Sequence, residues 1–231
     1  MIFKGLRALF LIDNRLLGMK YSQKNIEIVL KAMEKAVEGF PPPMSELIVR
    51  DYGKDPYLIL ISCLLSLRSR DPVTYAVSKE LFLHATTPQA MVQMPLAELE
   101  KILRPIGFFR RKAVIIKEVS HDLLERFGGQ VPSTEQELLS IKHVGRKTAN
   151  LILSMAFDQP ALCVDTHVHR IANHLGLVHT KNPDSTEFEL KKIVSQGWWG
   201  RLNHIFVLWG QNVCKPAAKS CACKDFLSHI L

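Results

Sequence analysis

Apolar residues recur along most of this chain at the three- and four-residue spacing of amphipathic helices, whereas the alternation that marks β-strands is scarce. A clear example runs over residues 26–37, where Val29 and Met33 share one face. This segment ends near a glycine and three consecutive prolines, which do not continue a helix. The pattern therefore predicts an all-α protein.

Several helix boundaries follow from local signals. Residues 57–67 are almost wholly apolar, which predicts a central helix that is buried on most sides and ends at Arg68. An amphipathic helix over 113–127 should end at the two glycines that follow it. At Asp71–Pro72 and Thr87–Pro88, a residue that can cap a helix start is followed by proline, which suits the first helical position. Thr134 and Glu137 have the three-residue spacing of a capping box. Short helices with tight connections are indicated.

The composition suits a soluble protein with a polyanionic partner. Of the 231 residues 47% are hydrophobic, and 30 Lys and Arg face 22 Asp and Glu, a formal charge of +8. This balance favours nucleic acid, with an anionic membrane surface as the other possibility. Against a membrane, the apolar run near the N-terminus, residues 8–12, is too short for a spanning helix or a signal peptide. We expect a cytoplasmic protein without a membrane partner.

The five cysteines fall into two groups. Cys63 and Cys163 lie in apolar stretches, where a reduced cysteine usually behaves as a small buried hydrophobe. Cys214, Cys221 and Cys223 cluster near the C-terminus at a density that buried packing rarely explains. We therefore expect no disulfide framework and regard the three clustered cysteines as candidate metal ligands.

A glycine turn that leads into a basic helix start is the most informative local motif. Residues 139–149 read as helix, hairpin and helix around Gly145. Such a start exposes backbone N–H groups and the positive end of the helix dipole, so it can hold a phosphate. We expect the N–H groups of Val144 and Gly145 and the side chain of Arg146 to face a DNA backbone. A plain connection between two helices is the alternative interpretation.

A similar pattern of a glycine followed by basic residues occurs at 105–113. It adds Arg111 and Lys112 to the residues expected to contact DNA. Two explanations of this similarity are equally good: a duplication of the segment, or the use of glycine in this way by any two tight connections between helices. Either account gives two basic turns.

An amine and a carboxylate accompany these turns. Lys147 follows Arg146, and Asp165 can cap a later helix. A neutral lysine amine can attack a sugar carbon and hold it as a Schiff base, while a nearby acid moves protons. For this the lysine pKa, about 10.4 when unperturbed, must fall by roughly three units, which costs about 4 kcal/mol. Asp165 favours the charged amine, so burial, the helix start and Arg146 must lower that pKa.

Together these features resemble the helix-hairpin-helix DNA glycosylases, and within them the endonuclease III type. The resemblance rests on residues 144–150, 164–170 and 64–66 with Asp71, and on the cysteine tail. It implies that Lys147 is the catalytic lysine and Asp165 the catalytic aspartate. Family members that excise bases without cutting the strand lack this lysine. Its presence therefore indicates a glycosylase that is also an abasic-site (AP) lyase, acting through a Schiff base and β-elimination.

The resemblance also implies a two-domain helical glycosylase fold and a monomer that acts on double-stranded DNA. The DNA would carry a damaged base, here an oxidised pyrimidine, or an abasic site. We expect an N-terminal extension over residues 1–20, one helical domain over 55–164 with the hairpin motif at about 135–156, and a second domain formed by 21–54 and 165–231.

Several interpretations stay open. Arg68 lies where the family often has a gap-filling glutamine, so it is a candidate wedge for a flipped base, but a solvated arginine at a helix end is as reasonable. The enzyme could instead prefer mismatched or alkylated bases, because pocket side chains set lesion choice. A non-catalytic helix-hairpin-helix DNA-binding protein is a further alternative, against which Lys147 and Asp165 argue.

The hairpin departs from the family pattern at two positions. Family members usually carry proline and glycine at the positions of Lys142 and His143, where the hairpin needs a left-handed residue. Histidine tolerates positive φ better than most residues, at some cost in strain. We expect both basic side chains to contribute at the DNA phosphates.

The cysteine tail departs further. The family holds an iron–sulfur cluster with four cysteines separated by six, two and five residues. Here Cys214 and Cys221 keep the first gap, Cys223 comes one residue early and no fourth cysteine follows. His229 could replace a thiolate in a cluster or a zinc site, but we expect a degenerate site without metal. His167 and His169 are not expected to bind metal, because a spacing of two places them on different helix faces.

Overall fold

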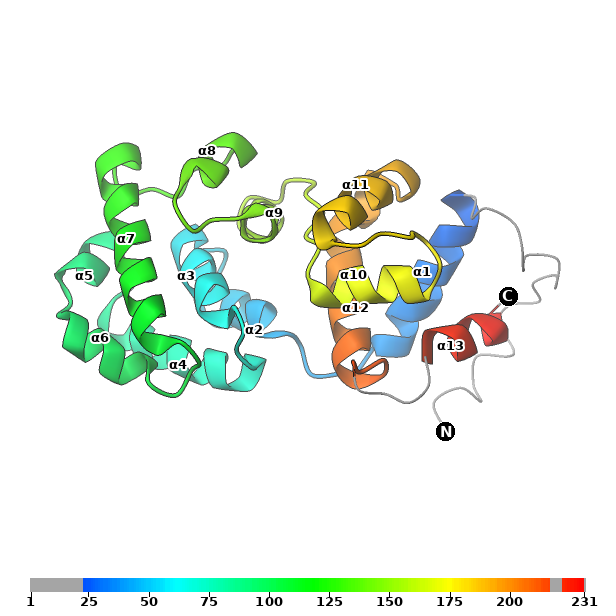
Figure 1. The fold of residues 1–231 in the computed structure, drawn as a ribbon, viewed down its shortest axis with the longest axis horizontal. Coiled ribbons are helices and arrows are strands. Elements are labelled where there is room, and N and C mark those ends of the chain that lie inside the picture. Colours follow the sequence, from blue (N-terminus) through cyan, green and yellow to red (C-terminus); the bar gives the residue numbers. More distant parts are fainter. Residues whose placement is uncertain (1–22, 217–221, 231) are drawn as a thin grey trace. The chain divides into compact units, whose positions relative to one another are not determined.

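The computed structural model describes residues 23–216 and 222–230, which contain helices and no strands and thus confirm the all-α prediction (Figure 1). The helices are α1 (Gln23–Val37), α2 (Met44–Tyr52), α3 (Pro56–Ser66), α4 (Asp71–His84), α5 (Pro88–Gln93), α6 (Leu96–Leu103), α7 (Phe109–Phe127), α8 (Glu135–Ser140), α9 (Arg146–Met155), α10 (Thr166–His174), α11 (Pro183–Ile193), η3 (Gln196–Trp198), α12 (Trp199–Asn212) and α13 (Ala222–Ile230). The expected extension over residues 1–20 lies outside the described residues.

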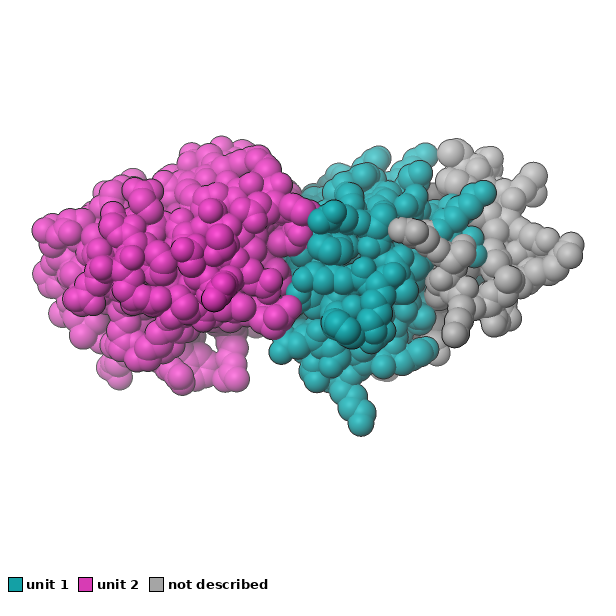
Figure 2. Space-filling view, turned by 90° about the horizontal axis from the view of Figure 1, so that it is seen from above, with its two compact units in different colours: residues 1–41, 162–231 teal, residues 42–161 magenta. Residues whose placement is uncertain are grey.

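The chain forms two compact units, coloured separately in Figure 2. Unit 1 comprises residues 1–41 and 162–231, and unit 2 comprises residues 42–161. The first boundary differs from the expected one after residue 54, because α2 packs on α3 and α4. Ile48 of α2 is fully buried there, and the Met44 N–H donates to Asp71 Oδ2 at 3.3 Å. Burial of the apolar face of α2 thus assigns this helix to unit 2.

Unit 2 is built around α3, the apolar helix that the sequence predicts. Asp55 caps its start, accepting hydrogen bonds from the N–H groups of Tyr57 and Leu58 at 2.9 and 3.0 Å. The residues from Tyr57 to Leu65 are all buried, and α3 contacts α2, α4, α7 and α9. Helix α9, whose start carries the glycine turn, therefore rests on the best-buried helix of its unit.

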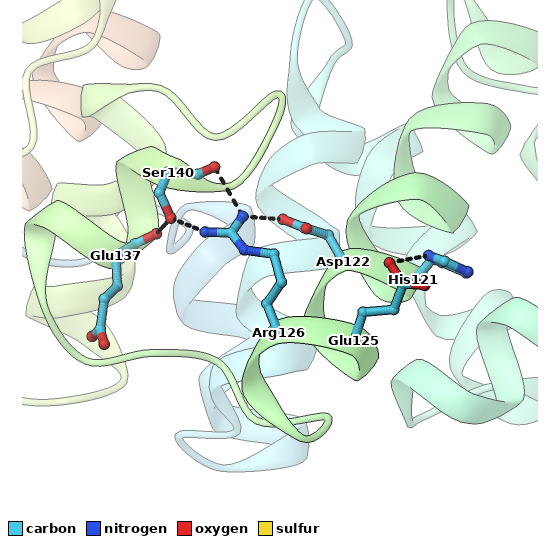
Figure 3. A network of polar contacts seen from close by, with 6 residues as sticks. All are labelled: His121, Asp122, Glu125, Arg126, Glu137 and Ser140. Atoms are coloured by element: carbon cyan, nitrogen blue, oxygen red, sulfur yellow. Dashed lines mark hydrogen bonds and ion pairs between the residues drawn. The ribbon is translucent and has the colours of Figure 1, made fainter.

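Helix α7 holds the hairpin formed by α8 and α9. Arg126 of α7 donates to the backbone oxygen and the Oγ of Ser140 at 3.1 and 2.6 Å, and to Asp122 at 2.8 Å (Figure 3). Ser140 is the last residue of α8, where helix geometry leaves carbonyl groups without partners inside the helix. The arginine satisfies such a carbonyl and fixes the end of α8 against α7.

In unit 1, α12 packs on α10 and α1, and α13 contacts α1 and α10. Trp198 and Trp209 are buried in the core of this unit, and Trp209 contacts Phe226 of α13 with ring centroids 4.7 Å apart. Gly210 lets α10 approach α12 closely: a Cβ there would lie 2.4 Å from His167 Nδ1 and 2.9 Å from Arg170 Nη2. This close contact fixes the helix that Asp165 begins.

Candidate active site

The glycine turn between α8 and α9 has the predicted helix-hairpin-helix arrangement. Thr134 caps α8, accepting from the Glu137 N–H at 3.3 Å, and Gly145 occupies the cap position of α9. The φ of Gly145 is −97°, which any residue can adopt, and a Cβ at Gly145 would meet nothing within 4 Å. Neither the backbone nor packing requires a glycine, so this position leaves open space at a positive helix end.

Val144 differs from the expectation that its N–H faces a ligand. The Val144 N–H donates to the backbone oxygen of Ile141 at 3.1 Å, and its side chain is buried. The hairpin uses this group to close its own turn, because a buried N–H without a partner is costly. At the turn, Gly145 is the position that remains open.

The two unusual residues of the hairpin contact α7. His143 has the left-handed φ of 72° that the sequence predicts for this position. Its Nε2 lies 2.7 Å from Glu118 Oε2, and Lys142 Nζ lies 3.0 Å from the same oxygen. The hydrogen bond with His143, followed by that with Lys142, lowers the pKa of Glu118. Both side chains thus contact a carboxylate within unit 2; His143 is half-buried there, whereas Lys142 stays exposed and its expected contact with a phosphate remains a prediction.

Glu118 is a residue that the sequence did not identify. It lies on α7, 25 positions before His143, and local patterns carry no information on such a contact. Its carboxylate supports a histidine whose left-handed backbone costs about 1–2 kcal/mol. The structure thus shows how this hairpin holds its turn with histidine at the left-handed position.

Arg146 and Lys147 are the first two residues of α9. Arg146 Nη1 lies 3.5 Å from Glu135 Oε1 of α8, and both side chains are more than two-fifths exposed. An ion pair this exposed contributes about 0–1 kcal/mol, so a phosphate can compete for the arginine. Lys147 is half-buried and directly precedes Thr148, Ala149 and Asn150, which are buried. Its stem is therefore held on the part of α9 that packs inward.

In the second basic turn, residues 105–113, one of the two basic side chains expected to face DNA is exposed and the other is buried. Arg111 is exposed, as expected. Lys112 is buried, and its amine donates to the backbone oxygen of Leu65 and to Ser69 Oγ, both at 2.8 Å. Burial lowers the pKa of Lys112 to about 8. Lys112 therefore anchors the loop after α3 and does not display its charge to DNA.

The loop that Lys112 anchors presents Arg68. Arg68 is exposed, has a left-handed φ of 56°, and its guanidinium lies 5.9 Å from the ring centroid of Phe108. Phe108 is itself left-handed at φ 58° and 61% exposed, and it directly precedes α7. Two strained residues in adjacent loops are a recurring property of binding sites. Phe108 is thus a second candidate contact that the sequence analysis missed, although its place directly after Gly107 could have signalled it.

Asp165 lies in unit 1 and caps α10. Its Oδ1 accepts hydrogen bonds from the N–H groups of His167 and Val168 at 2.9 and 2.8 Å, and the residue is half-buried. The second carboxylate oxygen, Oδ2, takes no part in this cap. The cap therefore fixes the carboxylate through one oxygen and leaves the other for a ligand or solvent.

His167 and His169, two of the three histidines of α10, pack on different neighbours, as their spacing predicts. His167 lies against Gly210 of α12, with its Nδ1 3.2 Å from Arg170 Nη2. His169 Nδ1 lies 2.6 Å from Thr186 Oγ1 of α11. Neither belongs to the group of potential metal ligands found among the described residues.

That group consists of His174, Cys214 and Cys223, whose ligand atoms all lie within 4.8 Å of one another. Cys221 and the side chain of His229, the other candidates from the sequence, lie outside the described residues. Two thiols and one imidazole do not fit the four-thiolate set of an iron–sulfur cluster. His174 was not recognised in the sequence because it lies 40 positions before Cys214.

Comparisons with known proteins agree with the geometry. Residues 61–196 match the HhH-GPD superfamily of base excision DNA repair proteins. Endonuclease III of Thermotoga maritima is 45% identical over 167 residues, 72% of this chain and 78% of that protein. Two solved structures, a non-covalent endonuclease III–DNA complex and a trapped covalent endonuclease III–DNA intermediate, align with TM-scores of 0.78 and 0.74, each at 32% identity. They cover 89% and 88% of this chain, and 95% and 92% of the solved chains.

A helix that crosses a membrane must be both long and apolar. None of the described helices combines the length and apolar character needed to cross a membrane.

Proposed function

The chain belongs to the HhH-GPD superfamily of base excision DNA repair proteins, and we propose that Lys147 and Asp165 carry out the glycosylase and AP lyase chemistry of an endonuclease III in it. The observation that carries this proposal is the start of α9. A glycine whose surroundings are open precedes Arg146 and Lys147 at the positive end of a helix. This arrangement suits a sugar–phosphate backbone.

DNA binding would use the open side of the hairpin. A phosphate at Gly145 would accept hydrogen bonds from the helix start, and Arg146 would leave its weak contact with Glu135 to join it. Arg68 and Phe108 supply a basic and an aromatic side chain suited to a base stack opened by flipping. Lys142, whose ion pair with Glu118 is at least as exposed as that of Arg146, can also reach a phosphate, whereas His143 and Lys112 hold the turn and the loop after α3 within unit 2.

The reaction starts with attack of the neutral Lys147 amine on C1′ of the sugar. A bond forms between Nζ and C1′ as the bond from C1′ to the base breaks, and the electron pair leaves with the base. Asp165 accepts the proton that the lysine releases, or stabilises the positive charge on the sugar. The C1′–O4′ bond then breaks and opens the sugar ring: the nitrogen gives up its remaining proton and forms the C1′=N bond of the Schiff base, while O4′ takes up a proton. The Schiff base acidifies the C2′ proton, and loss of that proton breaks the C3′–O3′ bond and releases the 3′ phosphate. Both activities therefore use one lysine.

The experiment is borohydride trapping on a duplex with an abasic site. Borohydride reduces the Schiff base to a stable amine, so wild-type protein should form a covalent adduct with DNA. Lys147→Ala should lower adduct formation by about 1,000-fold or more, because it removes the nucleophile. Lys101→Ala, at an exposed position of α6 in the same unit, is the matched control and should trap normally.

Two outcomes would contradict the proposal. An adduct that survives in Lys147→Ala would show that another amine is the nucleophile. Salt-sensitive DNA binding by the wild type without trapping or strand cleavage would favour a non-catalytic DNA-binding protein. A panel of duplexes with oxidised, alkylated or mismatched bases then tests our proposal that oxidised pyrimidines are the preferred lesions.

A further inference from the structure

We propose that His174, Cys214 and Cys223 bind a single zinc ion, at the place where endonuclease III relatives would hold an iron–sulfur cluster. The three residues come from separate elements of unit 1. His174 is the last residue of α10, Cys214 follows the end of α12, and Cys223 lies in the first turn of α13. Tertiary packing alone brings them together.

The distances fit one ion. His174 Nδ1 lies 3.4 Å from Cys214 Sγ, and all three ligand atoms lie within 4.8 Å of one another. With Zn–S near 2.3 Å and Zn–N near 2.0–2.1 Å, tetrahedral geometry separates a bound nitrogen and sulfur by about 3.6 Å and two sulfurs by about 3.8 Å. Small side-chain movements would therefore complete three corners of a tetrahedron.

The same distances do not suit a cluster. A four-iron cluster places four thiolates around a core of irons and sulfides, so its cysteine sulfurs lie farther apart than the ligands of a single ion. The spacing of Cys223, one residue early, also departs from the cluster pattern. One imidazole with thiolates is instead a donor set that zinc uses in structural sites.

The surroundings preorganise these ligands. Cys214 and Cys223 are buried, and the N–H of Cys214 donates to the Trp209 backbone oxygen at 2.9 Å. Arg170 Nη2 donates to the backbone oxygen of Cys214 at 2.8 Å, which holds the end of α12 on α10. His174 is exposed, so an ion can reach the site from solvent. A bound ion would join α10, α12 and α13.

The test measures metal directly, without an assay of activity. The full-length protein is purified under reducing conditions, analysed for zinc, iron and acid-labile sulfide, and titrated with Co²⁺, whose thiolate charge-transfer absorption reports sulfur ligands. We expect about one zinc per chain. His174→Gln should weaken zinc affinity by roughly a hundredfold, since it removes one of a few ligands. His179→Gln, an exposed histidine of the same unit, should bind as the wild type does.

The cysteines are tested in the same way. Cys214→Ser and Cys223→Ser should lose the Co²⁺ charge-transfer band in proportion to the sulfur removed, while Cys163→Ala should keep it. Circular dichroism verifies that each variant folds, and His174→Gln decides the question if a cysteine variant does not. Stoichiometric iron and sulfide, a disulfide between Cys214 and Cys223 without metal, or unchanged zinc affinity in His174→Gln would each overturn the proposal.

Discussion

Two helix starts carry the proposed chemistry, and they are built in opposite ways. Helix α9 is preceded by the cap residue Gly145, which provides no side chain and leaves open space in front of the helix. Helix α10 is preceded by the cap residue Asp165, whose Oδ1 already accepts from two backbone N–H groups. The first start keeps its positive end available for an anion from outside, whereas the second satisfies it with its own carboxylate.

A helix start can thus serve two purposes: that of α9 can bind a phosphate, whereas that of α10 positions the carboxylate of Asp165. An open helix start attracts a phosphate but does not fix a side chain. A capped start fixes a carboxylate through one oxygen and leaves the other available for proton transfer. Because Asp165 combines a cap with a proposed catalytic role, replacing it can harm stability and activity for separate reasons, which substitutions can distinguish.

Asp165→Asn should have the largest effect, on activity alone. Asparagine is as good a cap as aspartate, so the free energy of unfolding should change by less than about 0.5 kcal/mol. Loss of the carboxylate should lower single-turnover base excision by about 100- to 1,000-fold. Asp55→Asn makes the same change at the two-bond cap of α3 and should leave excision unchanged. Equal effects of the two variants would make Asp165 a cap only.

Gly145→Ala should weaken DNA binding without destabilising the fold. The φ of −97° and the empty surroundings accept a methyl group, so the free energy of unfolding should stay within about 0.5 kcal/mol of the wild-type value. The methyl group would stand where a phosphate approaches, which should raise the Kd for duplex DNA about tenfold, the loss of one charged hydrogen bond. Gly197→Ala, also in open surroundings, is the control for fluorescence-anisotropy titrations. Unchanged DNA affinity in Gly145→Ala would refute the binding role of this start.

Substitutions in the turn before α9 should have the smallest effect, on the free energy of unfolding only. His143→Ala and His143→Gly both remove the contact with Glu118, but only glycine relieves the left-handed backbone. Urea unfolding should therefore find the glycine variant more stable by about 1–2 kcal/mol. At Lys142, where φ is not positive, the order should reverse, with alanine the more stable. The same order at both positions would mean that the hairpin relaxes its backbone.

Much of the fold could be predicted from local sequence. The apolar run that becomes α3, the glycines that end α7, and the cap at Thr134 are all found where the sequence places them. Each depends on neighbours within about one helical turn, which a sequence displays directly. The left-handed conformation of His143 was expected from the resemblance, because family members usually carry glycine at this position of the hairpin.

The failures concern contacts between distant positions. Lys112 reads as one more basic residue after a glycine, but the loop after α3 folds over it and supplies oxygen partners for its amine. Residues 42–54 belong to unit 2, although no local pattern indicates that α2 packs on α3 and α4. In both cases burial, and not composition, decided the role.

By itself, the sequence determined an all-helical chain with a glycine turn, a lysine at one helix start and an aspartate at another, because these features follow from local spacing and capping. The tertiary structure decided which charges remain exposed. It buried Lys112, paired His143 and Lys142 with Glu118, and brought His174 to two cysteines. Those outcomes depend on packing between segments far apart in the chain, where burial fixes partners that local patterns do not specify.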